Sequence, residues 1–98
     1  MSEMFTFIYV LKLVGDRTPE KLSNTDEAIV DEHFEYLKKG LSDGVVCLAG
    51  RCLDGEFGIV IFNADSMEHA MQFMKSDPAV INGVMEAELH PFRIALQK

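Results

Sequence analysis

The amino-acid sequence predicts an α+β fold whose elements follow the order β-α-β-β-α-β. Segments rich in aromatic and β-branched residues alternate with segments in which apolar residues recur at helical spacing. The polar stretches between them contain the Gly, Pro, Asp and Asn residues that end helices and strands. The length of 98 residues suits one hydrophobic core, so we expect residues 1–98 to form a single domain.

The first strand and the first helix are expected in the amino-terminal half. Residues 4–13 are aromatic and β-branched and predict a strand. The polar loop of residues 15–24 has a length that is typical both of loops beside a pocket and of plain surface structure. A helix is expected from near Asn24 or Thr25 to Asp43-Gly44, with Gly40 weakening its last turn. Its apolar stripe, expected to face the core, consists of Val30, Phe34, Leu37 and Leu41.

A β-hairpin, a second helix and a last strand are expected in the remainder of the chain. Residues 45–53 predict the second strand, Asp54-Gly55 is a strong turn signal, and residues 57–62 return as the antiparallel partner. The second helix is expected to be capped by Asp65 or Ser66 and to be ended by Pro78. The last segment contains Pro91, which predicts an edge strand, a bulge or two short strands.

Both faces of the predicted sheet are apolar. Two helices cover only one face of a four-stranded antiparallel sheet, and a half-exposed sheet normally alternates apolar and polar residues. The element order is that of the ferredoxin-like split motif, with both helices on one face. We therefore expect a homodimer that packs through the helix-free sheet face, because most soluble oligomers are symmetric. In the first strand, Phe5, Phe7 and Tyr9 lie on one face and Ile8 and Val10 on the other; in the third strand, Ile59 and Ile61 lie on one face and Val60 and Phe62 on the other.

Composition excludes several kinds of partner and compartment. The net charge is −7 and there is no Lys/Arg cluster, so no nucleic acid partner is expected. The apolar run near the amino terminus lacks a basic leader and is interrupted by Thr6, Tyr9 and Lys12. It matches neither a signal peptide nor a membrane span, and we expect a cytoplasmic protein without a membrane partner. Cys47 and Cys52 are expected on opposite faces of one strand, reduced and unable to pair.

Known cofactor and nucleophile motifs do not occur in the chain. There is no phosphate-binding glycine loop, no dinucleotide fingerprint and no G-x-S-x-G, and the His, Cys and carboxylate residues lack a metal-ligand spacing. We therefore expect no cofactor and no metal. Arg51 and Arg93 are candidate anion-binding residues, and each is equally consistent with a surface salt bridge. His69 is expected to be exposed, and His90 to be structural.

Several short motifs are spread over nearly the whole chain: His33-Phe34-Glu35-Tyr36-Leu37, Leu48-Ala49-Gly50, Asp54-Gly55, Gly58-Ile59, Ala70, Ser76-Asp77-Pro78 with Gly83, and Pro91-Phe92. Their order and spacing resemble the YCII-related family. The resemblance implies a ferredoxin-like fold and a dimeric α/β barrel, in which two sheets pack together. Some relatives are dehalogenases of chlorinated muconolactones, and most have no assigned reaction. The chain departs from the family at Arg51, where a proline often follows Ala-Gly.

The resemblance also implies a catalytic pair, His33 and Asp77. His33 borders the apolar stripe of the first helix, and its spacing alone favours a partly buried histidine with one hydrogen bond, whereas the resemblance favours the catalytic role. Asp77 is equally explained as the end of the second helix. The chemistry of the pair fits proton transfer, because histidine titrates near neutrality and a carboxylate fixes its tautomer.

Two functions are consistent with these observations. The first is a small cofactor-free enzyme in which His33 and Asp77 perform acid/base chemistry on a small organic substrate, such as a carboxylate or a lactone. The alternative is a non-catalytic small-molecule-binding or assembly module with the same dimeric α/β barrel architecture. A fold by itself does not distinguish the two.

Overall fold

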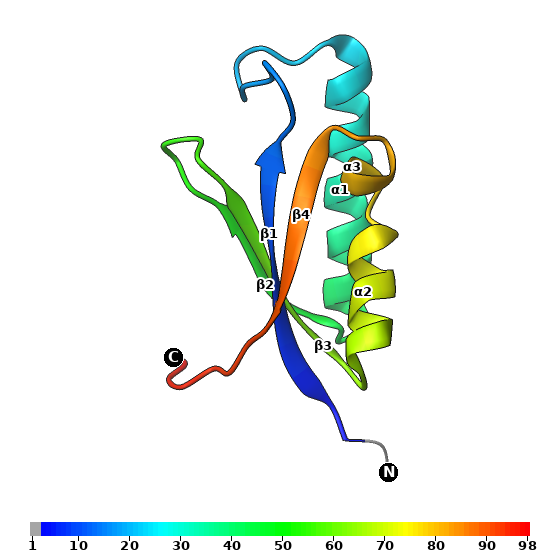
Figure 1. Ribbon diagram of the computed structural model, residues 1–98, viewed down its shortest axis with the longest axis vertical. Helices are drawn as coiled ribbons and strands as arrows, with labels where there is room; N and C mark the ends of the chain where they lie inside the picture. Colours follow the sequence, from blue (N-terminus) through cyan, green and yellow to red (C-terminus); the bar gives the residue numbers. More distant parts are fainter. Residues whose placement is uncertain (1–2) are drawn as a thin grey trace.

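The computed structural model describes residues 3–98, so residues 1 and 2 of the predicted domain lie outside the described residues. Strands and helices follow the predicted order, with one further short helix before the last strand (Figure 1). The elements are β1 (Phe5–Leu13), α1 (Asn24–Ser42), β2 (Val46–Arg51), β3 (Gly58–Ala64), α2 (Met67–Lys75), α3 (Pro78–Ile81) and β4 (Met85–Pro91).

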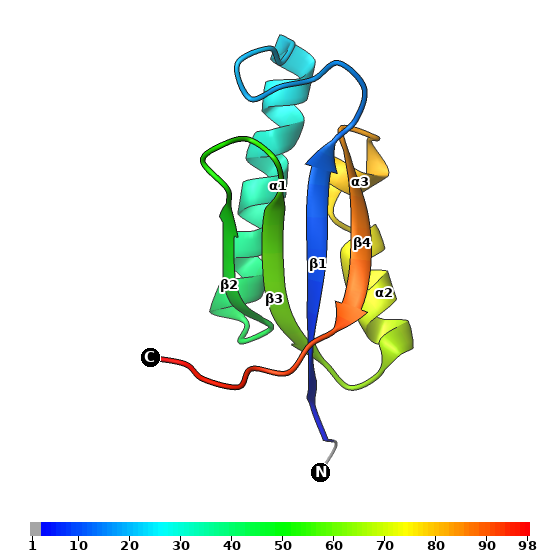
Figure 2. The same ribbon diagram turned by 60° about the vertical axis from the view of Figure 1, so that its left-hand side comes forward.

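The strands form one antiparallel sheet in the order β2-β3-β1-β4. All helices lie on one face of this sheet, with α1 behind β2 and β3 and with α2 and α3 behind β1 and β4 (Figure 2). The predicted fold class is therefore confirmed as α+β, with a ferredoxin-like βαββαβ order, a four-stranded antiparallel sheet and the helices on one face. β4 is an edge strand that ends at Pro91, which agrees with the inability of proline to donate to a ladder.

The hydrophobic core lies between the sheet and the helices. Alternate residues of β1 and β3 face the helices, because side chains alternate along a strand with period two. Tyr9 pairs with Val60 and Phe7 with Phe62 in the β1–β3 ladder, and all four side chains are buried. The ring of Phe73 in α2 packs 4.8 Å from that of Phe62, centroid to centroid. Aromatic contacts thus connect the two layers.

Helix α1 buries only part of the apolar stripe that the sequence predicts. Leu37 is buried and Val30 is half-buried, as expected, but Phe34 is 59% exposed and Leu41 is 57% exposed. Gly40 is the other buried position, with His33 on the same side two turns earlier. The prediction was wrong at Phe34 and Leu41 because two of the positions that face the core are a histidine and a glycine, which a search for apolar periodicity does not detect.

Gly40 permits the close approach of α1 to the sheet. A Cβ atom at this position would lie 2.7 Å from Cγ2 of Val46 and 3.4 Å from Cζ of Phe73. The first distance is shorter than any normal carbon–carbon contact. The glycine that was expected only to weaken the helix end is therefore a packing residue, and the helix continues past it to Ser42.

The carboxyl-terminal half departs from the prediction in two places. Pro78 does end α2, but it also opens α3, a helix of 4 residues whose N-cap is Asp77. Strand β2 ends at Arg51 and has a register irregularity between Val46 and Leu48, so Cys52 lies beyond the strand. The expectation that both cysteines lie on one strand was therefore wrong, because the hairpin turn begins earlier. Both are free thiols.

The face of the sheet opposite the helices is apolar at its centre. The ladders place Val10 beside Ile59, and Ile8 beside Ile61, with Leu48 of β2 next to Ile61. This confirms that the central strands are apolar on both sides. Residues 92–98 extend to the same side of the sheet (Figures 1 and 2). Within residues 3–98, no helix is both long enough and apolar enough to cross a membrane.

The contact at Gly40 leads to a stability prediction. We expect Gly40→Ala to lower the free energy of unfolding by up to about 2 kcal/mol, because overpacking of about 1–3 kcal/mol exceeds the helix-propensity gain of about 1 kcal/mol. In a Val46→Ala background the colliding methyl group is absent, so the same change should be neutral or stabilising. Urea unfolding of the four proteins measures the difference. An equal effect of Gly40→Ala in both backgrounds would contradict the proposed contact.

Candidate active site

Asp77 is positioned by the junction of two helices. Its backbone N–H bonds to the carbonyl of Met74 at 3.2 Å, at the end of α2, and its side chain caps α3 by accepting from the N–H of Ala79 at 3.0 Å. Pro78 follows at the first helical position, where its missing N–H is not needed. The side chain is completely buried. The Asp-Pro dipeptide thus ends one helix, begins the next and places a carboxylate inside the core.

Two further donors approach this carboxylate from the sheet and from α1. The hydroxyl of Tyr9 donates to Oδ2 at 2.8 Å. Nδ1 of His33 lies 2.7 Å from Oδ1 and 2.8 Å from Oδ2. The side chain of His33 is 12% exposed. His33 and Asp77, 44 residues apart in sequence, therefore meet within one chain rather than across an interface.

These contacts determine where the proton of the histidine lies. An ionised carboxylate only accepts hydrogen bonds, so Nδ1 of His33 is the protonated nitrogen. The other ring nitrogen, Nε2, is then free to exchange a proton with a bound molecule. Burial of the Tyr9 hydroxyl, followed by the charge of Asp77 and the hydrogen bond to it, raises the pKa of Tyr9 far above its usual value. Tyr9 therefore remains a donor throughout the physiological pH range.

A second tyrosine lies beside this cluster. The hydroxyl of Tyr36 donates to the backbone carbonyl of Phe73 at 2.8 Å, and the two rings stack with their centroids 5.0 Å apart. Burial, with a smaller contribution from the charge of Asp77, raises the pKa of Tyr36 to about 12. The cluster behind His33 therefore consists of two neutral hydroxyl groups and one buried carboxylate.

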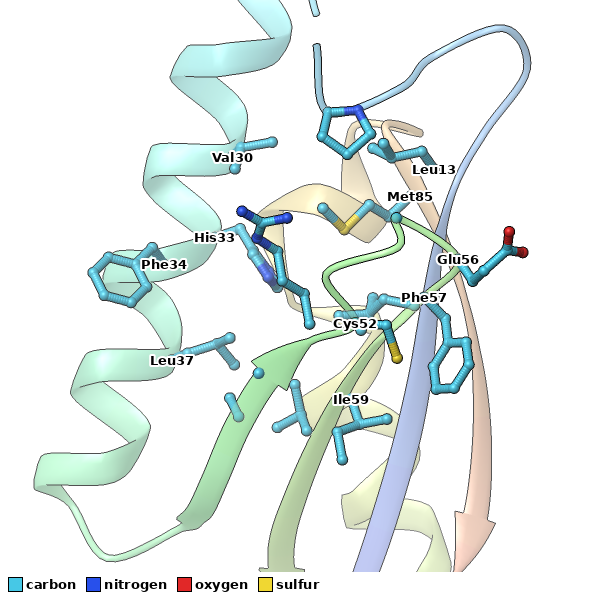
Figure 3. A pocket seen from close by; sticks show the side chains of 18 of the residues that line it. Leu13, Val30, His33, Phe34, Leu37, Cys52, Glu56, Phe57, Ile59 and Met85 are labelled. Carbon is cyan, nitrogen blue, oxygen red and sulfur yellow. The ribbon is translucent and has the colours of Figure 1, made fainter. Parts of the chain in front are cut away.

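His33 forms part of the wall of a cavity of about 580 Å³. The cavity lies between α1, the loop after β1 and the β2–β3 hairpin (Figure 3). Its volume is within the range of about 300–1,000 Å³ that is usual for small-molecule sites. The wall is mainly apolar, and its apolar residues include Leu11, Leu13, Leu22, Val30, Leu37, Phe57, Ile59 and Met85.

The loop between β1 and α1 closes one end of the cavity. Pro19 and Leu22 of this loop line it, so the long loop borders a pocket. Arg17 anchors the loop by donating to Oδ2 of Asp26 at 2.9 Å and to the carbonyl of Val14 at 3.1 Å. Hydrogen bonding to Arg17 lowers the pKa of Asp26 and keeps this pair charged.

The polar residues of the cavity wall were only partly foreseen. Arg51 lines the cavity, together with Asp31, Glu56 and Cys52, whereas Arg93 lies in a separate hollow beside Pro91. Tyr9 was missed as a site residue because a tyrosine in an apolar strand looks like any other core residue. The signal available was its hydroxyl group, which needs a hydrogen-bond partner once it is buried.

The other histidines lie away from the cavity. His69 is exposed, as expected, and pairs with Asp65 on the surface of α2. His90 is 51% exposed, and its Nε2 lies 3.3 Å from a carboxylate oxygen of Glu88. Across residues 3–98 no group of three or more His, Cys, Asp or Glu side chains is arranged to hold a metal ion.

The model of the YCII-related domain matches residues 9–93. The chain belongs to the YCII-related family. This range contains Tyr9, His33 and Asp77, as well as the whole cavity wall described above. No curated protein matches the chain.

The fold of this YCII-related chain is also similar to that of a solved enzyme. This is the 5-chloro-2-hydroxyhydroquinone dehydrochlorinase of Burkholderia phenoliruptrix AC1100, in complex with 2,5-dihydroxybenzoquinone. The TM-score is 0.62 at 16% sequence identity, and the match covers 90% of this chain and 93% of the dehydrochlorinase. At this identity the similarity shows the fold.

The buried hydroxyl of Tyr9 leads to a prediction about stability and pH. We expect Tyr9→Phe to lower the free energy of unfolding at pH 7 by about 1–3 kcal/mol, because a buried carboxylate loses a donor. Above about pH 10 tyrosine ionises in the unfolded chain, while Tyr9 stays protonated in the folded protein. The native protein should therefore lose stability more steeply with rising pH than the variant does. Urea unfolding at pH 7 and at pH 10.5 measures both effects, and parallel pH dependences would contradict the burial of an un-ionised Tyr9.

Proposed function

We propose that this protein is a small cofactor-free enzyme that uses His33 and Asp77 for acid/base chemistry on a small organic substrate. One observation carries the proposal. Nδ1 of His33 is held 2.7 Å from a completely buried carboxylate, while the same imidazole lines a mainly apolar cavity. The imidazole that the buried carboxylate orients therefore borders a space of the size that holds a small molecule.

The chemistry follows from the arrangement of the pair. Nε2 of His33 takes a proton from a C–H or O–H group of the substrate, and the electrons of that bond remain on the substrate as an enolate, an alkoxide or a new double bond. Asp77 stabilises the imidazolium that forms, in the manner of the carboxylate in a hydrolase triad. The imidazolium then returns the proton to another atom of the substrate or to a leaving group. A positioned base of this kind contributes about 10²–10⁴-fold in rate.

The size and polarity of the cavity suggest the class of substrate. Its apolar wall of about 580 Å³ suits a single ring with polar substituents. The fold similarity to an enzyme that removes chloride from a hydroxyhydroquinone supports a ring-sized substrate, at the level of fold only. Hydroxyquinones, lactones and small aromatic carboxylates all belong to this class.

We further propose that the protein works as a homodimer, the dimeric α/β barrel, packed through the helix-free sheet face. The apolar residues at the centre of this face support the proposal, because Ile8, Val10 and Ile59 are only half-buried and Leu48 is 46% exposed, and an apolar surface of this kind marks an interface. The position of the cavity adds a second argument. Gly50 and Ile59 line the cavity although their ladder positions lie on the helix-free face. A second copy on that face would therefore cover the open edge of the cavity.

The catalytic role of the pair predicts a graded loss of activity. We expect His33→Ala to reduce the rate by about 10²–10⁴-fold, because the proton acceptor is removed. Asp77→Asn should also slow the reaction, because an amide does not stabilise the imidazolium, while asparagine still caps α3. The measurement is proton or chloride release from a panel of chlorinated hydroxyquinones, lactones and aromatic carboxylates.

His69→Ala is the matched control for this experiment. His69 also pairs with a carboxylate, but on the surface of α2 and away from the cavity. Its loss should leave the rate unchanged. If the native protein binds members of the panel without turnover, or if turnover survives His33→Ala, the binding-module function would replace the enzymatic one.

The proposed dimer is tested by a charge at the centre of the helix-free face. We expect Ile8→Lys to convert a dimer into a monomer or to unfold the chain, because a buried unpaired charge is strongly unfavourable. Ile81→Lys, at a 65% exposed position of α3, should leave the protein a dimer with the same sedimenting mass as the native protein. Sedimentation equilibrium at micromolar concentration, with circular dichroism as a check on folding, distinguishes these outcomes. A native protein that sediments only as an 11.0 kDa species would contradict the dimer.

A further inference from the structure

We propose that Arg51 is a substrate-binding residue that holds an anionic group, a carboxylate or an ionised enol, beside His33. This inference rests on the proposed function and specifies its substrate. Arg51 lines the same cavity as His33. It supplies the positive charge there, where the other wall residues that are charged at neutral pH, Asp31 and Glu56, are acidic.

The strand register places Arg51 on the side of the sheet that carries the acid/base pair. Arg51 is opposite Gly58, and Gly58 is opposite Leu11 in β1. Leu11 is two residues from Tyr9, so the two share a face of the strand. Arg51 and Tyr9 therefore both point to the helix-facing side of the sheet. On this side the hydroxyl of Tyr9 donates to Asp77.

The residue opposite Arg51 leaves space beside it. Gly58 has no side chain, and a Cβ atom there would lie 3.1 Å from the carbonyl oxygen of Gly50 and 3.7 Å from Cβ of Arg51. The first distance is tight and the second is an ordinary contact, so glycine at position 58 keeps the strand beside Arg51 free of a side chain. Arg51 itself is exposed at the end of β2, where it lines the cavity.

Arg51 differs from the arginine of the neighbouring loop in having no partner. Arg17 pairs with Asp26, whereas no carboxylate among residues 3–98 forms an ion pair with Arg51, although Asp31 and Glu56 line the same cavity. A guanidinium group with five donors and no partner at the edge of an apolar cavity is suited to a planar anion, which it binds through two parallel hydrogen bonds.

The charge of the whole protein makes such a residue necessary for an anionic substrate. With a net charge of −7, the protein repels anions at long range, so local attraction has to come from a specific cation. An anion held at Arg51 would orient the ring across the apolar wall toward His33. The guanidinium would also stabilise the negative charge that develops when His33 removes a proton from an adjacent atom.

Binding of benzoate and of its neutral isostere benzamide tests the proposal directly. We expect the native protein to bind benzoate more tightly than benzamide, as measured by NMR chemical-shift titration of labelled protein. Arg51→Met should weaken benzoate binding by about ten- to a hundredfold, as is typical when a hydrogen-bonded charge is removed, and should leave benzamide binding unchanged. Arg51→Lys should retain part of the preference for benzoate, because lysine keeps the positive charge but lacks the planar pair of donors that binds both carboxylate oxygens.

Arg93→Met is the matched control, because it removes the same charge outside the cavity and should leave both affinities unchanged. Equal affinities of the native protein for the two probes, no benzoate binding up to its solubility limit, or equal effects of Arg51→Met and Arg93→Met would each overturn the role of Arg51. A different outcome would contradict only the proposed acid/base function. In that case turnover survives His33→Ala, while the preference for benzoate over benzamide still depends on Arg51.

Discussion

The burial of one carboxylate constrains much of this structure. Asp77 is completely enclosed, and an ionised side chain in that position is tolerated only when its oxygens are bonded. Its donors come from β1 (Tyr9), α1 (His33) and the first turn of α3 (Ala79), segments that are far apart in the sequence. The register of the sheet, the position of α1 and the short helix after α2 all have to be correct at once for the carboxylate to be satisfied.

The same constraint produces the geometry on which the proposed reaction depends. Because Nδ1 of His33 is bonded to Asp77, the orientation and the tautomer of the ring are fixed before any ligand binds. The packing that stabilises the core therefore also orients the side chain that we propose as the proton acceptor at the wall of the cavity. Tyr9 does not line the cavity. It contributes to this site by donating a hydrogen bond to the carboxylate of Asp77. Its effect on chemistry would be exerted through Asp77 alone, as a positioning residue.

The cavity combines this buried pair with a more open edge formed by the hairpin. β2 is an edge strand of only 6 residues, and the end of the hairpin diverges from α1 (Figure 1). Residues of both elements line the cavity. Residues from both faces of the sheet line the cavity at this edge. In our proposal, a second copy that packs on the helix-free face therefore also closes the cavity. Arg51 lies at the same edge, and in our proposal its side chain selects the ligand without contacting the Asp77 cluster.

The sequence by itself determined the element order, the hairpin turn at Asp54-Gly55 and the apolar character of both sheet faces, because these depend on periods of two and of about 3.6 residues and on local turn chemistry. The identities of His33 and Asp77 came from the resemblance to a family. Only the tertiary structure decided which face of α1 is buried and that Tyr9 completes the site. The contact of Tyr9 with Asp77 spans 68 residues of the chain, and it is set by strand register and helix packing, which no local pattern encodes.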